Sequence, residues 1–266
     1  MILYKLNSER KLCMITFEAK IKDRIVRMYA GYPMKNAAGA IFKTLTQICN
    51  ETDADIFNDK FVMNFGWSFF FMSERKDNNG NVFYVVQSSD YKKNPMRDKT
   101  DDVTLSLLAQ NMQVETVRVA NVQPESATFK DTILVLKEAM NAPDVYMNRN
   151  EAAKNGDSGW YFGLLNDPNE ENHSSDDYIK LPSCELFKFR SEALRVMEMP
   201  VGTLAVFHDN VMTALVDGND QPLKFTTEEE RKAAAEKSRA EFEAEVAAAK
   251  ARAEQAKEEK KDEENV

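Results

Sequence analysis

Gly156-Asp157-Ser158-Gly159-Trp160-Tyr161-Phe162-Gly163-Leu164-Leu165 joins a tight polar turn to a strongly apolar strand. Glycine adopts backbone conformations that other residues avoid, and a buried tryptophan fills a large volume of core. Aspartate and serine hydrogen-bond to nearby backbone groups in turns. We therefore expect a turn at 156–159, a buried strand over 159–165, and Trp160 at the centre of a core.

The flanking sequence alternates apolar runs with turn residues. Apolar, largely β-branched and aromatic runs predict further strands at 132–140, 144–147, 178–181, 204–207 and 211–216. A long acidic loop covers 166–177, and a turn and a helix cover 183–199. Pro200-Val201-Gly202 then forms a turn into the strand at 204–207.

The first half of the chain gives the same mixture. Strands are expected at 13–17, 25–29, 61–65, 66–71, 82–86 and 115–119, and amphipathic helices at 36–50 and 101–112. The polar run at 77–81 predicts a hairpin turn. The sequence therefore predicts an α+β fold of two small mixed α/β lobes with largely antiparallel sheets.

The two halves share one short pattern. Gly66-Trp67-Ser68-Phe69 and Gly159-Trp160-Tyr161-Phe162 both read Gly-Trp-x-Phe, and a tyrosine strand follows each at a similar distance. Two interpretations stay open: a pseudo-duplication of one unit, or chance similarity between two hairpins.

The C-terminal segment differs in composition from the rest. Residues 226–266 hold 11 Ala, 13 Asp+Glu and 9 Lys+Arg with no Gly or Pro, which predicts a charged, solvated helix. We expect three parts: an N-terminal α+β domain at 1–125, a second domain at 130–222, and this helical tail at 226–266.

Bulk charge and cysteine content restrict the class of protein. The net charge of −9 and pI of about 5.0 leave no basic face for nucleic acid. Cys13, Cys49 and Cys184 form no close pair, so we expect reduced, packed cysteines rather than disulfides or a zinc site. The N-terminus becomes charged too early for a signal peptide, and no apolar run is long enough to span a membrane. A cytoplasmic protein is expected.

Two segments contain residues of the types that catalysis or metal binding would need. Gly156-Asp157-Ser158-Gly159 is similar to a serine nucleophile turn, and His208 with Asp209 would have to act as base and orienting group. In the acidic loop, Asp167, Asn169 and Glu171 have the alternate spacing of a calcium loop, but its glycine and its closing glutamate are replaced by Asn172 and Tyr178. We therefore expect no catalytic residue, no metal and no cofactor.

The segment from about 130 to 210 resembles the immunity protein 33 family, a former domain of unknown function. The resemblance rests on Asp157-Ser158-Gly159-Trp160-x-Phe162, the acidic loop that ends in Asp177-Tyr178, and the closing run through Pro200 and Gly202. Members carry an adjacent Arg-Glu pair before this motif, whereas Asn150 separates Arg149 from Glu151 here.

The resemblance implies a bacterial immunity protein that binds a toxin and blocks it by occlusion. The partner-binding residues would be Glu170, Glu171, His173, Asp176 and Asp177, facing a basic protein. The alternative is a scaffold protein that docks a component through the helix at 226–266. Neither role involves nucleic acid or a membrane.

Overall fold

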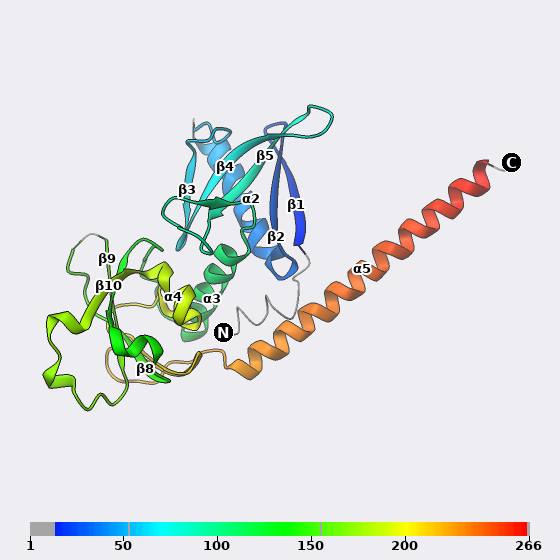
Figure 1. Ribbon diagram of the computed structural model, residues 1–266. Helices are drawn as coiled ribbons and strands as arrows, with labels where there is room; N and C mark the ends of the chain where they lie inside the picture. The colour runs from blue at the N-terminus through cyan, green and yellow to red at the C-terminus, as the bar shows by residue number, and fades with distance from the viewer. Residues whose placement is uncertain (1–13, 53, 155, 265–266) are drawn as a thin grey trace. The chain divides into compact units, whose positions relative to one another are not determined.

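The computed structural model describes residues 14–52, 54–154 and 156–264, and it contains two six-stranded β-sheets (Figure 1). The chain divides into a compact unit that ends at Thr227 and a helical unit that begins at Glu228. Both sheets and all the helical segments before Glu228 belong to the compact unit.

The first sheet has the strand order β1-β2-β5-β4-β3, with β6 paired to β5. The pair β2–β5 is parallel and the other pairs are antiparallel. Its strands are β1 (Met14–Ile21), β2 (Arg24–Gly31), β3 (Val62–Phe65), β4 (Ser68–Lys76), β5 (Val82–Ser89) and β6 (Lys99–Thr100). The hairpin between β4 and β5 closes where the Asp77 carboxylate accepts hydrogen bonds from the amides of Asn79 and Asn81.

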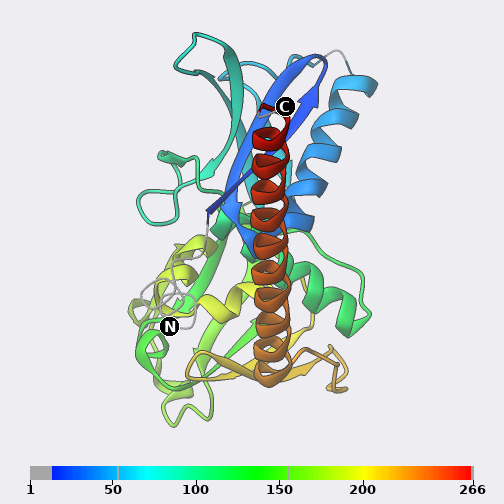
Figure 2. The same ribbon diagram turned by 90° about the vertical axis from the view of Figure 1, so that its right-hand side faces the viewer.

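Helix α2 (Lys35–Glu51) covers one face of this sheet, and Figure 2 shows it alongside the strands. Ala38, Ile41, Leu45 and Cys49 recur at helical spacing and are buried, so one stripe of α2 packs into the first core. A short 3₁₀ turn, η1 (Tyr32–Met34), leads from β2 into this helix.

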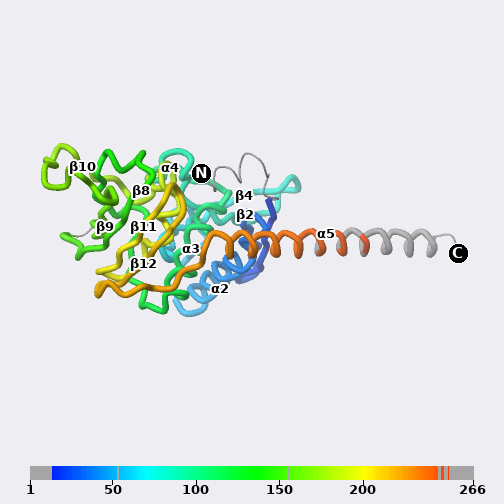
Figure 3. The backbone as a smooth tube through the Cα atoms, turned by 90° about the horizontal axis from the view of Figure 1, so that it is seen from below, coloured from blue at the N-terminus to red at the C-terminus, as the bar shows by residue number. Residues whose placement is uncertain are grey.

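The second sheet has the order β10-β7-β9-β8-β11-β12, and Figure 3 shows β8, β9, β11 and β12 side by side. Only the β7–β9 pair of this sheet is parallel. The strands are β7 (Thr132–Leu136), β8 (Asp144–Arg149), β9 (Asp157–Leu164), β10 (Tyr178–Pro182), β11 (Leu204–His208) and β12 (Val211–Val216).

Short helical segments connect these strands. They are η2 (Lys137–Asn141), η3 (Glu170–Asn172), η4 (Ser175–Asp177), η5 (Ser183–Glu185), α4 (Leu186–Phe189) and η6 (Ser191–Val196). Four of them, η2, η5, α4 and η6, contribute buried residues to the second core. Inward-facing residues of the sheet, such as Trp160, Phe162 and Phe207, are fully buried against α4 and η6 in the second core.

Helix α3 (Thr104–Ala120) joins the two lobes. Val103, directly before the helix, and Leu107 lie in the first core, whereas Ala109, Val117 and Ala120 pack into the second. Gln113 also donates a hydrogen bond to the Leu194 carbonyl at 3.0 Å. A strand at 115–119 was expected from the valines there, and this prediction is wrong, because those residues continue α3 and bury Thr116 and Val117 on its inner side.

Trp67 is the second joint between the lobes. It lies in the turn before β4, yet its indole is buried in the second core and donates to the Ser183 hydroxyl at 3.2 Å. The rings of Tyr91, Phe129 and Phe187 surround it with centroid distances of 5.5, 6.1 and 5.8 Å. A first-lobe side chain therefore completes the core of the second lobe.

Helix α5 (Glu228–Glu264) forms the separate helical unit. Its ion pairs follow the spacing of an exposed helix, with Lys232–Glu228 at 2.6 Å and Arg239–Glu243 at 2.8 Å. Among the described residues, no helix is long and apolar enough to cross a membrane.

The predicted α+β fold with two lobes and a C-terminal helix is confirmed. The boundaries proposed for the first two domains, 1–125 and 130–222, stay a prediction. The two Gly-Trp runs occupy different places in their sheets, because β4 pairs with the tyrosine strand β5, whereas β10 pairs with β7 and not with β9. This difference favours chance similarity over duplication. Cys49 and Cys184 are free and buried, and Cys13 lies outside the described residues.

Candidate functional site

The Asp157-Ser158-Gly159 segment forms a bulge in β9. Between Thr132 and Leu134 strand β7 advances two residues, while β9 advances four, from Asp157 to Tyr161. Gly159 has φ +75°, and a Cβ there would lie 2.0 Å from the Asn150 carbonyl oxygen, so only glycine fits. The Asp157 carboxylate accepts the Gly159 amide at 3.0 Å and closes the turn.

The Ser158 side chain stabilises this bulge, and it lies too far from His208 to form a catalytic pair with it. Its hydroxyl donates to the Thr132 carbonyl at 2.8 Å and accepts the Trp160 amide at 3.2 Å, and the residue is 4% exposed. His208 pairs with Asp144 at the opposite end of β8, roughly 15–20 Å away at the rise of an extended strand. The hypothesis of a Ser158–His208 nucleophile pair is therefore wrong.

Arg149 has a structural role at the near end of β8. Its guanidinium is 3% exposed and donates to the carbonyls of Glu125, Ser126, Met197 and Met199. Burial lowers its pKa, and the nearby Glu125 carboxylate partly offsets this effect. Trp160 donates its indole N–H to the same Met197 carbonyl at 3.3 Å. Arg149 and Trp160 together fix the end of η6.

The Pro200-Val201-Gly202 turn is held by the same strand end. The Gly202 amide donates to the Arg149 carbonyl at 2.8 Å, and the Thr203 carbonyl accepts the Arg149 amide at 2.9 Å. Gly202 has φ +89° and lies against Gly218, which explains the glycine at this position. Of the residues expected to form the structural motif, Trp160 and Gly202 contact Arg149 directly, and Asp157, Ser158 and Gly159 form the bulge beside it. Phe162 follows in β9 opposite Met147, and Tyr178 lies at the other end of the sheet.

That other end of the second sheet collects carboxylates. Strands β7, β9 and β11 end there and β8, β10 and β12 begin there, so their connecting segments meet. We call these carboxylates the acidic rim: Glu138, Asp144, Asp167, Glu170, Glu171, Asp176, Asp177 and Asp209. Both histidines of the sequence lie at this end, with His208 Nδ1 at 2.7 Å from Asp144.

Three of the expected partner-binding residues are exposed, and the other two hold the loop together. Glu170, Glu171 and Asp176 are exposed. His173 Nε2 lies 2.7 Å from the Asp167 carboxylate, and its Nδ1 lies 3.9 Å from that of Asp177. Asp177 also accepts the Ser174 amide and hydroxyl at 2.7 and 3.0 Å. His173 and Asp177 therefore position the loop, while the other three face solvent.

This arrangement makes the acidic loop sensitive to pH. The hydrogen bond with Asp167 raises the pKa of His173, while burial lowers it and Asp177 raises it further. Because the pKa of His173 is raised in the folded protein, protonated His173 stabilises the loop fully below the ordinary histidine pKa. This stabilisation is lost as pH rises through the folded-state pKa of His173. We expect ¹⁵N relaxation to show residues 167–177 more rigid at about pH 5.5 than at about pH 8.5.

The matched controls use the two histidines. His173→Gln retains a hydrogen-bond donor but does not titrate, so the loop should lose its pH dependence. His208→Gln should leave that dependence intact, since His208 is 62% exposed and pairs with Asp144 outside the loop. A pH response that persists in His173→Gln would contradict this role of His173.

Three tyrosines lie beside the acidic rim. The rings of Tyr146 and Tyr161 are 5.6 Å apart, and those of Tyr161 and Tyr178 are 6.2 Å apart. The imidazole of His173 lies 6.0 Å from the Tyr178 ring, which connects the row to the acidic loop. Sequence reasoning placed these tyrosines in strands but missed their cluster, because strand order brings them together.

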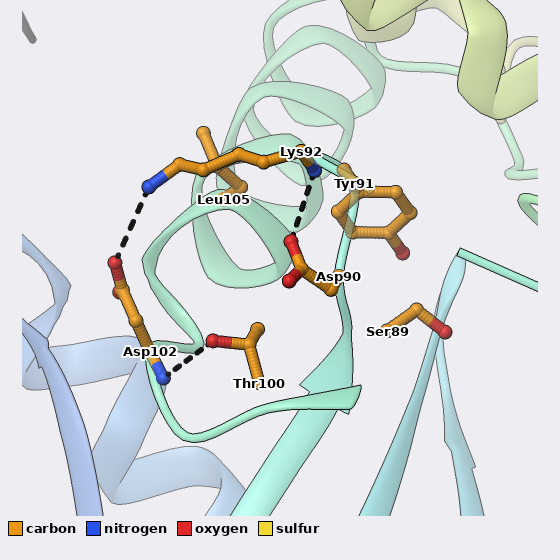
Figure 4. Close-up of a pocket in the computed structure, with 7 residues that line it drawn as sticks. All are labelled: Ser89, Asp90, Tyr91, Lys92, Thr100, Asp102 and Leu105. Atoms are coloured by element: carbon orange, nitrogen blue, oxygen red, sulfur yellow. Dashed lines mark hydrogen bonds and ion pairs between the residues drawn. The ribbon is translucent and has the colours of Figure 1, made fainter. Parts of the chain in front are cut away.

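Within the described residues, no group of three or more His, Cys, Asp or Glu is arranged to hold a metal. A cavity of about 20 Å³ lies in the first lobe beside Asp90, Lys92 and Asp102 (Figure 4). That volume accommodates a single water. Its polar groups pair with one another, as in the Lys92–Asp102 contact at 3.8 Å.

Charge is distributed unevenly along the chain. Residues 112–217 contain 17 Asp+Glu and 9 Lys+Arg, a net charge of −8, whereas residues 1–111 contain 13 and 16, a net charge of +3. The second lobe therefore carries most of the acidity of the protein.

These features define an α+β domain built on a mixed sheet, with a bulged DSGW strand at one end and an acidic rim at the other. Residues 112–217 match the family model of the Imm33-like domain. The predicted resemblance is confirmed, and the match is wider than the expected 130–210, because it begins within α3. No curated protein and no solved structure matches the chain.

Proposed function

We propose that this chain is a non-catalytic immunity protein of a bacterium, acting in the cytoplasm, which neutralises a cognate toxin by covering its active surface. The observation that carries the proposal is the Imm33-like domain over residues 112–217. An inhibitor that acts by occlusion needs a complementary surface and no reaction centre.

The acidic rim supports this function. Glu170, Glu171 and Asp176 are exposed at one end of the sheet, and the domain around them has a net charge of −8. Acidic side chains at the edge of an interface accelerate association with a basic partner and suppress wrong partners. The loop is also pre-ordered by its capping box, which reduces the entropy lost on binding.

The test is co-expression with the product of the adjacent gene, as the candidate toxin. We expect the wild-type chain to restore growth and to form a complex with this product. Glu170→Lys with Glu171→Lys should weaken the complex about tenfold or more, mainly through slower association, as measured by surface plasmon resonance. Persistent toxicity without any complex would overturn the proposal.

Two control pairs accompany the rim variant. Glu51→Lys with Asp59→Lys makes the same charge change at exposed positions of the first lobe, and affinity should stay within about twofold. Glu236→Lys with Glu241→Lys makes the same charge change at exposed positions of α5. Loss of partner binding in the α5 pair alone would favour the scaffold alternative, in which that helix docks the partner.

A further inference from the structure

The second sheet carries a set of half-buried side chains on the side opposite its core. Tyr161 pairs with Leu134 of β7, Tyr146 pairs with Val206 of β11, and Leu204 pairs with Val216 of β12. Paired residues point to the same side of a sheet. These six residues are half-buried and none belongs to either core cluster. We call them the open face.

The tyrosines of the open face are held in place. The Tyr161 ring lies over Gly163, where an added Cβ would come within 2.6 Å of a ring carbon, so the glycine leaves room for the ring. Tyr161 contacts Tyr146 on one side and Tyr178 on the other. Burial raises the pKa of Tyr146 and of Tyr161, so both phenols are neutral at physiological pH. Ordered aromatic rings with polar tips are the residues that contribute most at protein interfaces.

The open face is continuous with the acidic rim. Tyr178 contacts both Tyr161 and His173 of the acidic loop, and the Glu170 and Asp167 carboxylates contribute to raising the pKa of Tyr146. Aromatic rings therefore lie directly beside several carboxylates. A guanidinium satisfies both, because its plane stacks on a ring while its edge donates two hydrogen bonds to a carboxylate.

We propose that the open face and the acidic rim form one docking surface for a basic protein that inserts arginine side chains between them. This rests on the proposed function, since it describes the part of the toxin that would be recognised. The chain already uses the same packing internally, with the Arg27 guanidinium 4.3 Å from the centroid of the Phe83 ring. A second copy of the chain fits poorly, because two domains of charge −8 would meet.

The probes are two defined peptides, hexa-arginine and hexa-lysine, titrated into the full chain and followed by calorimetry and by NMR. If charge attraction alone acts, the two peptides should bind with equal affinity, whereas stacking on tyrosine favours the arginine peptide. We expect hexa-arginine to bind about tenfold more tightly than hexa-lysine at about 0.15 M salt, with shifts at 146, 161 and 170–178.

Variants separate the rings from the charge. Tyr146→Ala with Tyr161→Ala should abolish the preference for arginine. Val206→Lys leaves both rings in place and adds to the open face a positive charge, which repels the positively charged peptide. It should weaken hexa-arginine binding about tenfold. This variant gives a second measurement if the alanine variant misfolds. Glu51→Lys with Asp59→Lys should change binding less than about twofold.

Equal affinity for the two peptides, or arginine preference that survives loss of both tyrosines, would overturn the docking surface. Self-association of the wild type that Val206→Lys removes would also overturn it, in favour of a homodimer. Protection from the toxin tests the proposed function separately. Protection without arginine preference would support the immunity role and reject this docking surface. Arginine preference without protection would support the docking surface and reject the immunity role.

Discussion

Replacing Trp67 by alanine should destabilise the protein by about 3–5 kcal/mol and separate the unfolding of its two lobes. The indole is fully buried, and it belongs to the first lobe by sequence but to the second core by contact. Removing it leaves a cavity among Tyr91, Phe129 and Phe187 and leaves the Ser183 hydroxyl without that donor. Urea denaturation should change from one transition to two, because α3 becomes the main remaining joint.

Trp160 allows the unfolding of the second lobe to be followed separately by fluorescence. The sequence contains two tryptophans, so in Trp67→Ala the fluorescence reports on the second lobe alone, while circular dichroism reports on both. Trp67→Phe is the matched control: it keeps an aromatic ring and loses the N–H donor, for a cost of about 1–2 kcal/mol and a single transition. A single transition in Trp67→Ala, shifted by less than about 1 kcal/mol, would show that Trp67 does not couple the lobes.

Local pattern predicted most elements of this fold. The buried stripe of α2, the β4–β5 hairpin and the strand around Trp160 follow from periodicity and turn residues, and each is present. The error at 115–119 shows the limit of propensity. Valines favour strands, but here Gln113, Thr116 and Val117 face inward at helical spacing. Gln113 and Thr116 hydrogen-bond to η6 and Val117 packs into the second core, so tertiary packing makes this segment helical.

The second sheet could not be assembled from the sequence. Asp144 and His208 are far apart in the chain and meet only because β8 pairs with β11. Tyr146 and Tyr161 are neighbours only because β8 pairs with β9 in this register. The acidic loop was visible as composition, and sequence reasoning therefore identified part of the rim but not the aromatic face beside it.

The DSGW run shows how a motif can suggest the wrong chemistry. Its serine has the flanking residues of a nucleophile, yet the structure uses the hydroxyl to bridge a bulge between β7 and β9. The glycine is required by a positive φ and by the approach of the Asn150 carbonyl. The motif therefore identifies a backbone conformation, and its connection to function is through the domain that it stabilises.

The second large effect is expected for Arg149, which lies at the same end of the second sheet as the DSGW run. Arg149→Met should cost about 3–5 kcal/mol, although methionine fills much of the same volume. The guanidinium donates to four carbonyls from two segments, residues 125–126 and 197–199, and methionine donates to none. The hydrogen bonds to the Met197 and Met199 carbonyls are buried, so these carbonyls then stay buried without this donor, or the segments separate and admit water.

Arg149→Lys tests whether charge alone is sufficient. A single ammonium cannot reach the carbonyls that the planar fork reaches, so we expect it to recover less than half of the lost stability. Arg118→Met is the matched control: it removes an exposed arginine from the last turn of α3 and should cost about 0.5 kcal/mol or less. Stability is measured by urea denaturation, and hydrogen exchange should show increased opening at 197–203. An Arg149→Met variant as stable as Arg118→Met would mean that the Pro200–Gly202 turn is held by its backbone hydrogen bonds to β8 without the guanidinium.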